Sequence, residues 1–189
     1  ILADSCTMLQ KTKKVMEFLG MHALSKKYGV EVMSFDKGEF VRKKIDGKYL
    51  KSVSVPKTIY EEDKIILLPC LKTHFLGRFT MSLKIAVALM KKIERAKLHM
   101  GHLEEKIAEL NLVYKPNLII LDGRKAFVTR GPEQGELAEP KILMAGTDRV
   151  ALDVEAVKIL QSYKAENKLN MDPWLLPQIK RAVELGLAV

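Results

Sequence analysis

Lys72 and His74 are the two residues of this 189-residue chain whose types and spacing best suit chemistry. They lie two positions apart, so on an extended segment their side chains point to the same side. A cation beside an imidazole suits the binding of an anionic group or a proton transfer. The alternative is that Lys72 is an exposed loop lysine and His74 a surface histidine with satisfied hydrogen bonds. We interpret both as candidate catalytic residues, with Lys72 supplying positive charge and His74 acid–base capacity.

The neighbouring polar residues Thr73, Ser82 and Lys84 are candidates for ligand binding. Ser82 and Lys84 lie where an apolar segment of helical length, residues 83–90, begins. At the start of a helix, a hydroxyl group and a lysine can bind a phosphate group. The chain contains neither GxxxxGK nor GxGxxG, which argues against a nucleotide P-loop and a dinucleotide fingerprint.

The elements that must position these residues are a strand over residues 65–68, a polar loop and a helix. Open α/β sheets bind ligands beyond the carboxyl ends of their strands in this order of elements. Two further expected strands also end in polar residues, because Asp4 follows the first strand and Asp122 follows residues 116–121. If the strands are parallel, the polar clusters share one sheet edge, with Asp122 as a third catalytic candidate and Gly123 beside the ligand. Asp and Gly are also common turn residues, which is the alternative for both.

The run RGPEQG at residues 130–135 predicts a binding loop or a lid, because Gly131 and Gly135 permit close approach of the backbone. A plain surface loop has the same composition. Asp148 follows another apolar run. We expect either Thr147 or Asp148 to cap the helix that begins near Arg149, and Asp148 is also a candidate for ligand binding.

Helical and strand patterns alternate along the chain, which predicts an α/β fold with a three-layer, mostly parallel sheet flanked by helices. An antiparallel hairpin is expected near residues 39–55, where Asp46-Gly47 separates two alternating runs. Helices are expected over four segments: 14–28, 91–112, 150–160 and 176–185. With 48% hydrophobic content, residues 1–189 are expected to form a single α/β domain. Because ILADS looks like the end of a strand, we expect this domain to lack upstream N-terminal strands.

The formal net charge of +9 invites a nucleic-acid hypothesis. Against it, the basic residues fall in short clusters typical of a solvated surface, and aromatic residues make up only 6% of the chain. Nucleic acid is therefore not the expected partner. No apolar run approaches the roughly 20 residues of a membrane-spanning helix, so no membrane partner is expected either.

The two cysteines, Cys6 and Cys70, form neither a CxxC pair nor a dense framework. This pattern favours a reducing, cytoplasmic setting and predicts no disulfide or metal signature. His99 and His102 lie three residues apart and would share one face of a helix. With a glutamate they could hold a metal ion, but HExxH is absent and a solvated histidine pair is the alternative. We predict no metal site.

Four motifs, taken in order, resemble the family catalogued as domain of unknown function 362: LLPCLKTHFLGRFTMSLK, NLIILDG, RGPEQG and MAGTDRVALDVEAV. The resemblance covers most of the chain, from residue 1 to about residue 160. By motif position it implies functional roles for these residues: Lys72, Thr73, His74, Ser82, Lys84, Asp122, Gly123, Gly131, Pro132, Gly135, Asp148 and Asp153. For Asp153, a charge that favours the helix dipole is the alternative to a ligand contact.

Members of this family often carry, or lie beside, ferredoxin-like segments that bind iron–sulfur clusters, so the resemblance implies redox or cofactor-linked work. This chain departs from the family pattern in two ways. It has no cysteine cluster, so no iron–sulfur cluster is ligated by this chain alone and such a role would need a further segment or a partner. In addition, SLKIAVALM replaces the family's usual SLKN continuation.

Three functional hypotheses follow. The first is an enzyme or enzyme domain that binds an anionic small molecule or cofactor at the strand ends, with a redox link implied by the resemblance. The second is a non-catalytic scaffold that docks an iron–sulfur protein partner through its basic face. The third is nucleic-acid binding through the basic surface.

Overall fold

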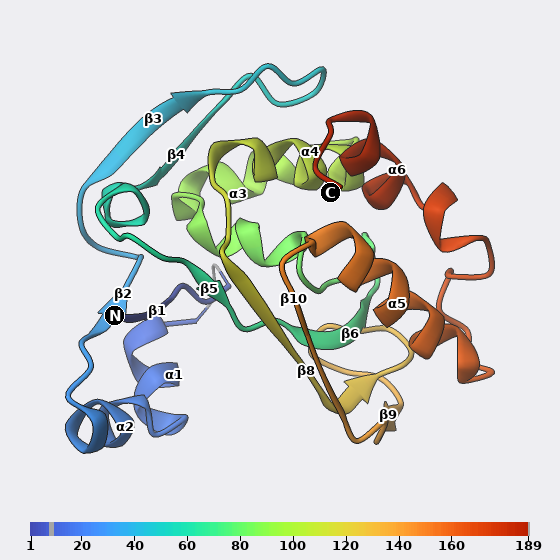
Figure 1. The fold of residues 1–189 in the computed structure, drawn as a ribbon, viewed down its shortest axis with the longest axis horizontal. Coiled ribbons are helices and arrows are strands. Elements are labelled where there is room, and N and C mark those ends of the chain that lie inside the picture. Colours follow the sequence, from blue (N-terminus) through green and yellow to red (C-terminus); the bar gives the residue numbers. More distant parts are fainter. Residues whose placement is uncertain (8–9, 189) are drawn as a thin grey trace.

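The computed structural model describes residues 1–7 and 10–188 (Figure 1). The N-terminal part contains two short parallel strands, β1 (Leu2–Asp4) and β2 (Val32–Ser34), joined through two helices. These helices are α1 (Thr12–Phe18) and α2 (Met21–Tyr28). Gly20 separates them with a φ of 71°, a left-handed conformation that glycine adopts without steric cost. The predicted helix over residues 14–28 is therefore two short helices.

The predicted antiparallel hairpin is confirmed as β3 (Phe40–Lys44) and β4 (Ser52–Pro56). Its connecting loop is longer than a two-residue Asp-Gly turn, and a buried carboxylate holds it in place. Glu109 accepts hydrogen bonds from the backbone N–H groups of residues 48, 49 and 50 at 2.7–2.9 Å. Burial opposes the ionisation of Glu109, but hydrogen bonds from Arg181 and the backbone outweigh it and lower the pKa.

The main sheet is built around one long strand, β8 (Leu118–Phe127). β8 pairs in parallel with β5 (Ile66–Leu67) and β6 (Cys70–His74), and antiparallel with β9 (Leu137–Ala138) and β10 (Ile142–Gly146). β7 (Arg78–Phe79) folds back on the end of β6. These strands and the helices that cover them confirm the α/β class.

β8 is longer than expected. The strand was predicted to end before Asp122, but it continues through Gly123 to Phe127. Gly123 pairs with Ile142 of β10, and a Cβ at Gly123 would lie 2.6 Å from the Ile142 side chain. The glycine is therefore a place of close packing between strands, not a turn. Asp122 in consequence lies inside the sheet, opposite Cys70, and not at a strand end.

In Figure 1 four helices lie above and to the right of β8, away from α1 and α2 at the lower left. They comprise α3 (Lys92–Leu98), α4 (Leu103–Leu110), α5 (Arg149–Ser162) and α6 (Pro177–Glu184). Gly101, with a φ of 70°, lies between α3 and α4, so the helical segment expected over residues 91–112 consists of two helices. The shorter 3₁₀ helices are η1 (Lys57–Tyr60), η2 (Lys84–Leu89), η3 (Asn111–Val113) and η4 (Pro173–Leu175). Among the described residues, no helix is long and apolar enough to cross a membrane.

The hydrophobic core lies between the main sheet and these helices. Its largest fully buried side chains come from β6, β7 and β8, from the covering helices and from the segments that join them: Leu71, Phe79, Met81, Leu83, Leu98, Ile107, Leu110, Ile119, Leu121, Leu160, Leu169 and Leu176. The carboxyl end of β6 and the start of η2 are thus anchored in the core on both sides. This anchoring fixes the backbone that carries Lys72, His74 and Lys84.

Candidate functional site

Thr73 and Gly131 hold the end of β6 in place. The Thr73 hydroxyl donates to the Phe127 carbonyl oxygen and accepts from the Gly131 N–H, both at 3.0 Å. The Phe75 N–H donates to the Gly131 carbonyl oxygen at 2.8 Å. A Cβ at Gly131 would lie 2.2 Å from the Thr73 carbonyl oxygen, so only glycine fits there. Both residues are buried and build the wall of the site.

His74 is buried, with 6% of its surface exposed. Its Nδ1 accepts hydrogen bonds from the N–H groups of Leu76 (3.2 Å) and Gly77 (3.0 Å), so the ring proton belongs on Nε2. Burial, followed by the nearby charges of Lys84, His99 and Lys72, lowers the pKa of His74 to about 3. His74 is therefore neutral at physiological pH and offers an Nε2–H donor. This environment favours hydrogen-bond donation over proton exchange.

Lys72 and Lys84 form the lysine pair, which lies beside His74. Lys72 is on β6, and Lys84 is the first residue of η2. Burial, followed by the charges of Lys72 and Arg95, lowers the pKa of Lys84 to about 8. Among the described residues, no side chain or backbone oxygen forms a hydrogen bond or an ion pair with either lysine ammonium group. The pair is thus a concentration of positive charge without a protein counter-ion.

A buried carboxylate fixes the backbone just before Lys84. Asp153 of α5 accepts hydrogen bonds from the N–H groups of Ser82 (2.8 Å) and Leu83 (2.9 Å). Burial raises the pKa of Asp153 to about 7, although the hydrogen bonds from these N–H groups favour the carboxylate form and act in the opposite direction. The Ser82 hydroxyl is buried and makes no hydrogen bond of good geometry, although it lies near enough to Asp153 to lower that pKa. Asp153 therefore positions the start of η2.

The remaining predicted site residues have local partners. Asp122 forms an ion pair with Arg124 at 2.7 Å, and hydrogen bonds from the Arg124 side chain and backbone lower the pKa of Asp122. Asp148 caps α5 by accepting from Val150 and Ala151, as one of the two sequence-based alternatives predicted. Gly135, with a φ of 131°, packs against the Thr129 carbonyl oxygen. The structure brings together Lys72, His74 and Lys84, but pairs Asp122 elsewhere.

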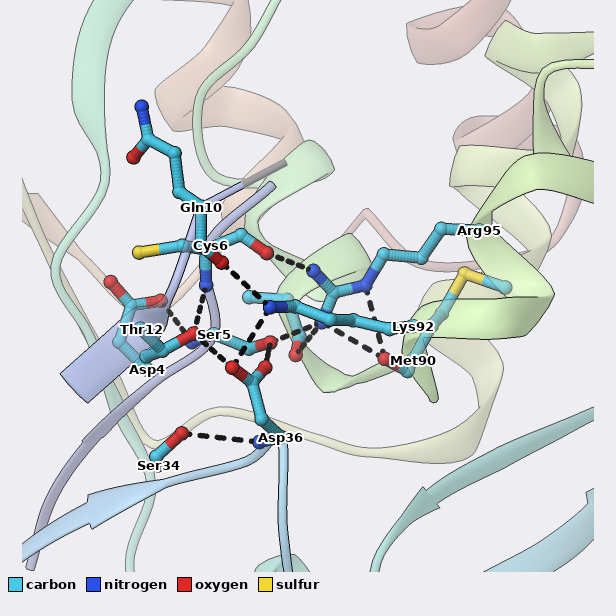
Figure 2. A network of polar contacts seen from close by, with 11 residues as sticks. Asp4, Ser5, Cys6, Gln10, Thr12, Ser34, Asp36, Met90, Lys92 and Arg95 are labelled. Carbon is cyan, nitrogen blue, oxygen red and sulfur yellow. Dashed lines mark hydrogen bonds and ion pairs between the residues drawn. The ribbon is translucent and has the colours of Figure 1, made fainter. Parts of the chain in front are cut away.

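A second polar cluster lies where β1 and β2 end (Figure 2). Asp36 accepts hydrogen bonds from the hydroxyls of Ser5 and Thr12, and its carboxylate forms an ion pair with Lys92 at 2.8 Å. Burial opposes the ionisation of Asp36, but the contacts with Lys92, Thr12 and Ser5 outweigh it and lower the pKa.

Arg95 forms hydrogen bonds within this cluster, and its charge also acts on Lys84. Its guanidinium donates to the Ser5 hydroxyl (2.6 Å) and to the carbonyl oxygens of Cys6 (2.7 Å) and Met90 (2.9 Å). Arg95 also contributes to the lowered pKa of Lys84, so the two clusters share one electrostatic environment. Unlike the lysine pair, however, Arg95 is satisfied by protein oxygens. It holds the N-terminal strands against the main body.

The residues considered for metal binding do not gather. Within residues 1–7 and 10–188, no group of three or more His, Cys, Asp or Glu side chains could hold a metal ion. His99 Nδ1 contacts the Arg95 carbonyl oxygen at 2.9 Å, whereas His102 stacks on Tyr49. Burial raises the pKa of both Cys6 and Cys70, which keeps them as thiols.

Comparison with known proteins gives the family. The model of a family described as a domain of unknown function, DUF362, matches residues 1–158. The chain belongs to the DUF362 family. A relative is the thylakoid-associated protein sll1697 of the cyanobacterium Synechocystis, 27% identical over 179 residues. The match covers 92% of this chain and 52% of the relative, so the chain spans about half the length of that protein.

In this DUF362 domain, Asp36, Lys92 and Arg95 are polar residues that the sequence reasoning did not single out. A charged residue within an amphipathic helical segment is ordinarily solvated, and α3 gave no sign that Arg95 is only 5% exposed. The polar residues Asp4 and Ser5 at the end of the first strand were the available signal. They did indicate that a polar cluster follows β1.

Proposed function

We propose that this DUF362 domain binds an anionic small molecule or cofactor, through a phosphate or carboxylate group, at the lysine pair. The observation that carries the proposal is that Lys72 and Lys84 lie close together with no counter-ion among the described residues. Repulsion and burial make two such charges costly unless an anion neutralises them. A phosphate or carboxylate between the two ammonium groups would supply that charge.

His74 provides a hydrogen-bond donor of defined direction beside the two lysine charges. Its Nδ1 is occupied by two backbone N–H groups, which leaves Nε2–H as the donor. A neutral donor beside two cations can bind an anionic oxygen or polarise a carbonyl oxygen without repelling either cation. The ligand is therefore expected to place an oxygen atom within hydrogen-bond reach of Nε2.

Lys84 is the residue that would act in catalysis if the bound molecule reacts. With a pKa of about 8, a sizeable fraction of Lys84 is a neutral amine near pH 8. The neutral amine can accept a proton from the incoming ligand, as general bases with pKa values near the operating pH do, and the ammonium group that forms then pairs with the anion. We therefore assign to Lys84 the proton exchange that the sequence predicted for His74. Asp122, which is paired with Arg124, is left out of the proposed chemistry.

The two other hypotheses predict different behaviour. A scaffold for an iron–sulfur partner would use the basic face without needing a partly buried lysine pair beside a neutral histidine. Nucleic-acid binding would depend on many exposed lysines and fall steeply with salt. Neither accounts for two lysines near His74 that have no ion-pair partner among the described residues.

The test is a thermal-shift screen against phosphorylated metabolites, nucleotides and dicarboxylates, followed by calorimetry with wild type and Lys72→Ala. Lys72→Ala is preferable to a His74 variant, because His74 Nδ1 supports the backbone at Leu76 and Gly77. Loss of one charged hydrogen bond should weaken binding about tenfold to a hundredfold. Lys115→Ala, at an exposed lysine outside the site, is the control. Ligands that bind equally to wild type and Lys72→Ala, or a screen without any ligand, would contradict the proposal.

A further inference from the structure

The helices α1 and α2 expose apolar side chains to an unusual degree. Phe18 is 90% exposed, and Leu19, Leu24 and Tyr28 are 59%, 45% and 63% exposed. No residue of α2 is buried. A surface helix of a globular protein ordinarily buries an apolar stripe against its own core. In Figure 1, α1 and α2 lie apart from α3 to α6, at the edge of the molecule.

The exposed apolar residues occupy defined places. Phe18 is the last residue of α1, and Leu19 follows it in the turn towards α2. Leu24 and Tyr28 are four residues apart on α2, so they share one helix face. The turn and this face together form what we term the α1–α2 surface.

Positive charge surrounds these residues. Five exposed lysines accompany the two helices: Lys11, Lys13, Lys14, Lys26 and Lys27. Glu17 is the one acidic residue between positions 11 and 28. None of the five lysines forms an ion pair with a residue that the structure describes. The complementary partner is therefore anionic and also accepts apolar groups.

We propose that the α1–α2 surface docks on an anionic lipid bilayer, with Phe18 and Leu19 entering the acyl region and the lysines contacting headgroups. Short helices with lysines on the polar side and Phe or Leu on the other are typical of interfacial membrane binding. Protein interfaces are depleted in lysine, which argues against a protein partner. Nucleic acid would use the lysines but gains nothing from the exposed leucines. The lack of a membrane-spanning helix does not bear on docking of this kind.

Sedimentation with phosphatidylglycerol–phosphatidylcholine vesicles tests the proposal, with pure phosphatidylcholine vesicles for comparison. Wild type should bind the anionic vesicles and bind the neutral ones weakly. Phe18→Ser should weaken binding about tenfold, because the inserted ring contributes most of the apolar transfer energy. Leu19→Ser should also weaken it, whereas Leu175→Ser, at a leucine that is likewise 59% exposed, should not. Removing lysine charge with Lys13→Gln and Lys14→Gln should cost about fivefold for each residue, and Lys115→Gln with Lys180→Gln should cost nothing.

Tryptophan fluorescence provides a second test, in which insertion into the membrane changes the emission. In a chain carrying Phe18→Trp and Trp174→Phe, which keeps one tryptophan, emission should shift to the blue on addition of anionic vesicles. Equal vesicle binding by wild type and Phe18→Ser, or an unshifted emission, would overturn the proposal. Binding of an oligonucleotide in place of vesicles would also overturn the proposal. The same holds if the protein forms a dimer in the absence of lipid and Phe18→Ser dissociates that dimer. Phe18→Ser leaves the lysine pair intact, so this variant should still bind phosphate at Lys72 and Lys84 when it no longer binds vesicles. The membrane proposal, which vesicle binding tests, can therefore fail without the proposed function failing.

Discussion

Lys84 lies close enough to Lys72 for the two charges to disturb each other, and no carboxylate of the described residues forms an ion pair with either lysine. Burial first, and then the charge of Lys72, lowers the pKa of Lys84 to about 8, from the ordinary value of 10.5. A folded protein that keeps such a pair carries an energetic cost in the unliganded state. Costs of this kind are typical of binding and catalytic sites, where strain or repulsion is relieved by the ligand.

Lys84→Met should stabilise the protein while abolishing anion binding. Because the pKa of Lys84 is lower in the folded state, the unfolded chain binds more protons between pH 8 and 10.5. Stability of the wild type should therefore rise with pH through that window. Below pH 8 the full cost is present, so Lys84→Met should raise the free energy of unfolding at pH 7 by about 1 kcal/mol after solvent screening. Urea unfolding at pH 7 and pH 10 checks this, and an equal gain at both would contradict it.

His74 should remain neutral as the protein is acidified. Burial and the charges of Lys84, His99 and Lys72 lower its pKa to about 3, below the ordinary 6.5. Nitrogen NMR of the imidazole should show the Nε2–H tautomer from pH 8 down to about pH 4, with the signal assigned by its loss in His74→Gln. Because the unfolded chain takes up this proton at higher pH, stability should also fall as pH drops from 6.5 towards 3. An ionisation of His74 near pH 6.5 would refute this.

Asp153→Asn should damage the site from a distance. The amide has one acceptor oxygen, and its NH₂ group would face a backbone N–H donor at Ser82 or Leu83. We expect a loss of about 1–3 kcal/mol in the free energy of unfolding and weaker ligand binding through the displaced Lys84. Glu155→Gln, at an exposed residue of the same helix, is the matched control and should change stability by less than about 0.5 kcal/mol. If Asp153→Asn and Glu155→Gln had equal effects on stability and ligand binding, Asp153 would not position Lys84.

Gly131→Ala should disrupt the wall of the site, whereas Gly77→Ala should not. A Cβ at Gly131 meets the Thr73 carbonyl oxygen at 2.2 Å, but a Cβ at Gly77 meets nothing nearer than 3.6 Å. Forcing the methyl group in at Gly131 should cost about 1–3 kcal/mol. Thermal unfolding of both variants measures the difference. Gly77→Ala keeps the N–H that donates to His74, so a large effect there would contradict the geometry.

The sequence predicted several elements because their signals are local. The hairpin, the cap at Asp148 and the end of α6 before Gly186 each depend on residues within a few positions. The proximity of Lys72 and His74 likewise followed from period-two spacing on an extended segment, although the sequence placed them in a loop after the strand and the structure places them on β6. Lys84 was placed near them by the strand, loop and helix order of α/β folds.

Other features depended on contacts between distant residues. The extension of β8 through Gly123 requires Ile142 on β10, and no residue near Gly123 encodes that close packing. The burial of Arg95 depends on Ser5 and on the carbonyl oxygen of Cys6, almost ninety positions away. The tautomer of His74 depends on a turn that follows it, which side-chain type alone does not reveal. Tertiary contacts of this kind decide which polar residues are structural.

The most direct test of the lysine pair is the pKa of Lys84. It can be measured by NMR of the Lys84 side-chain nitrogen in the absence and presence of inorganic phosphate. Without phosphate, Lys84 should titrate near pH 8, and in Lys72→Met its pKa should rise because one neighbouring cation is gone. With phosphate, the wild-type pKa should rise, since an anion favours the charged amine. A pKa near 10.5 without phosphate, or one that phosphate leaves unchanged, would contradict an anion site at Lys72 and Lys84.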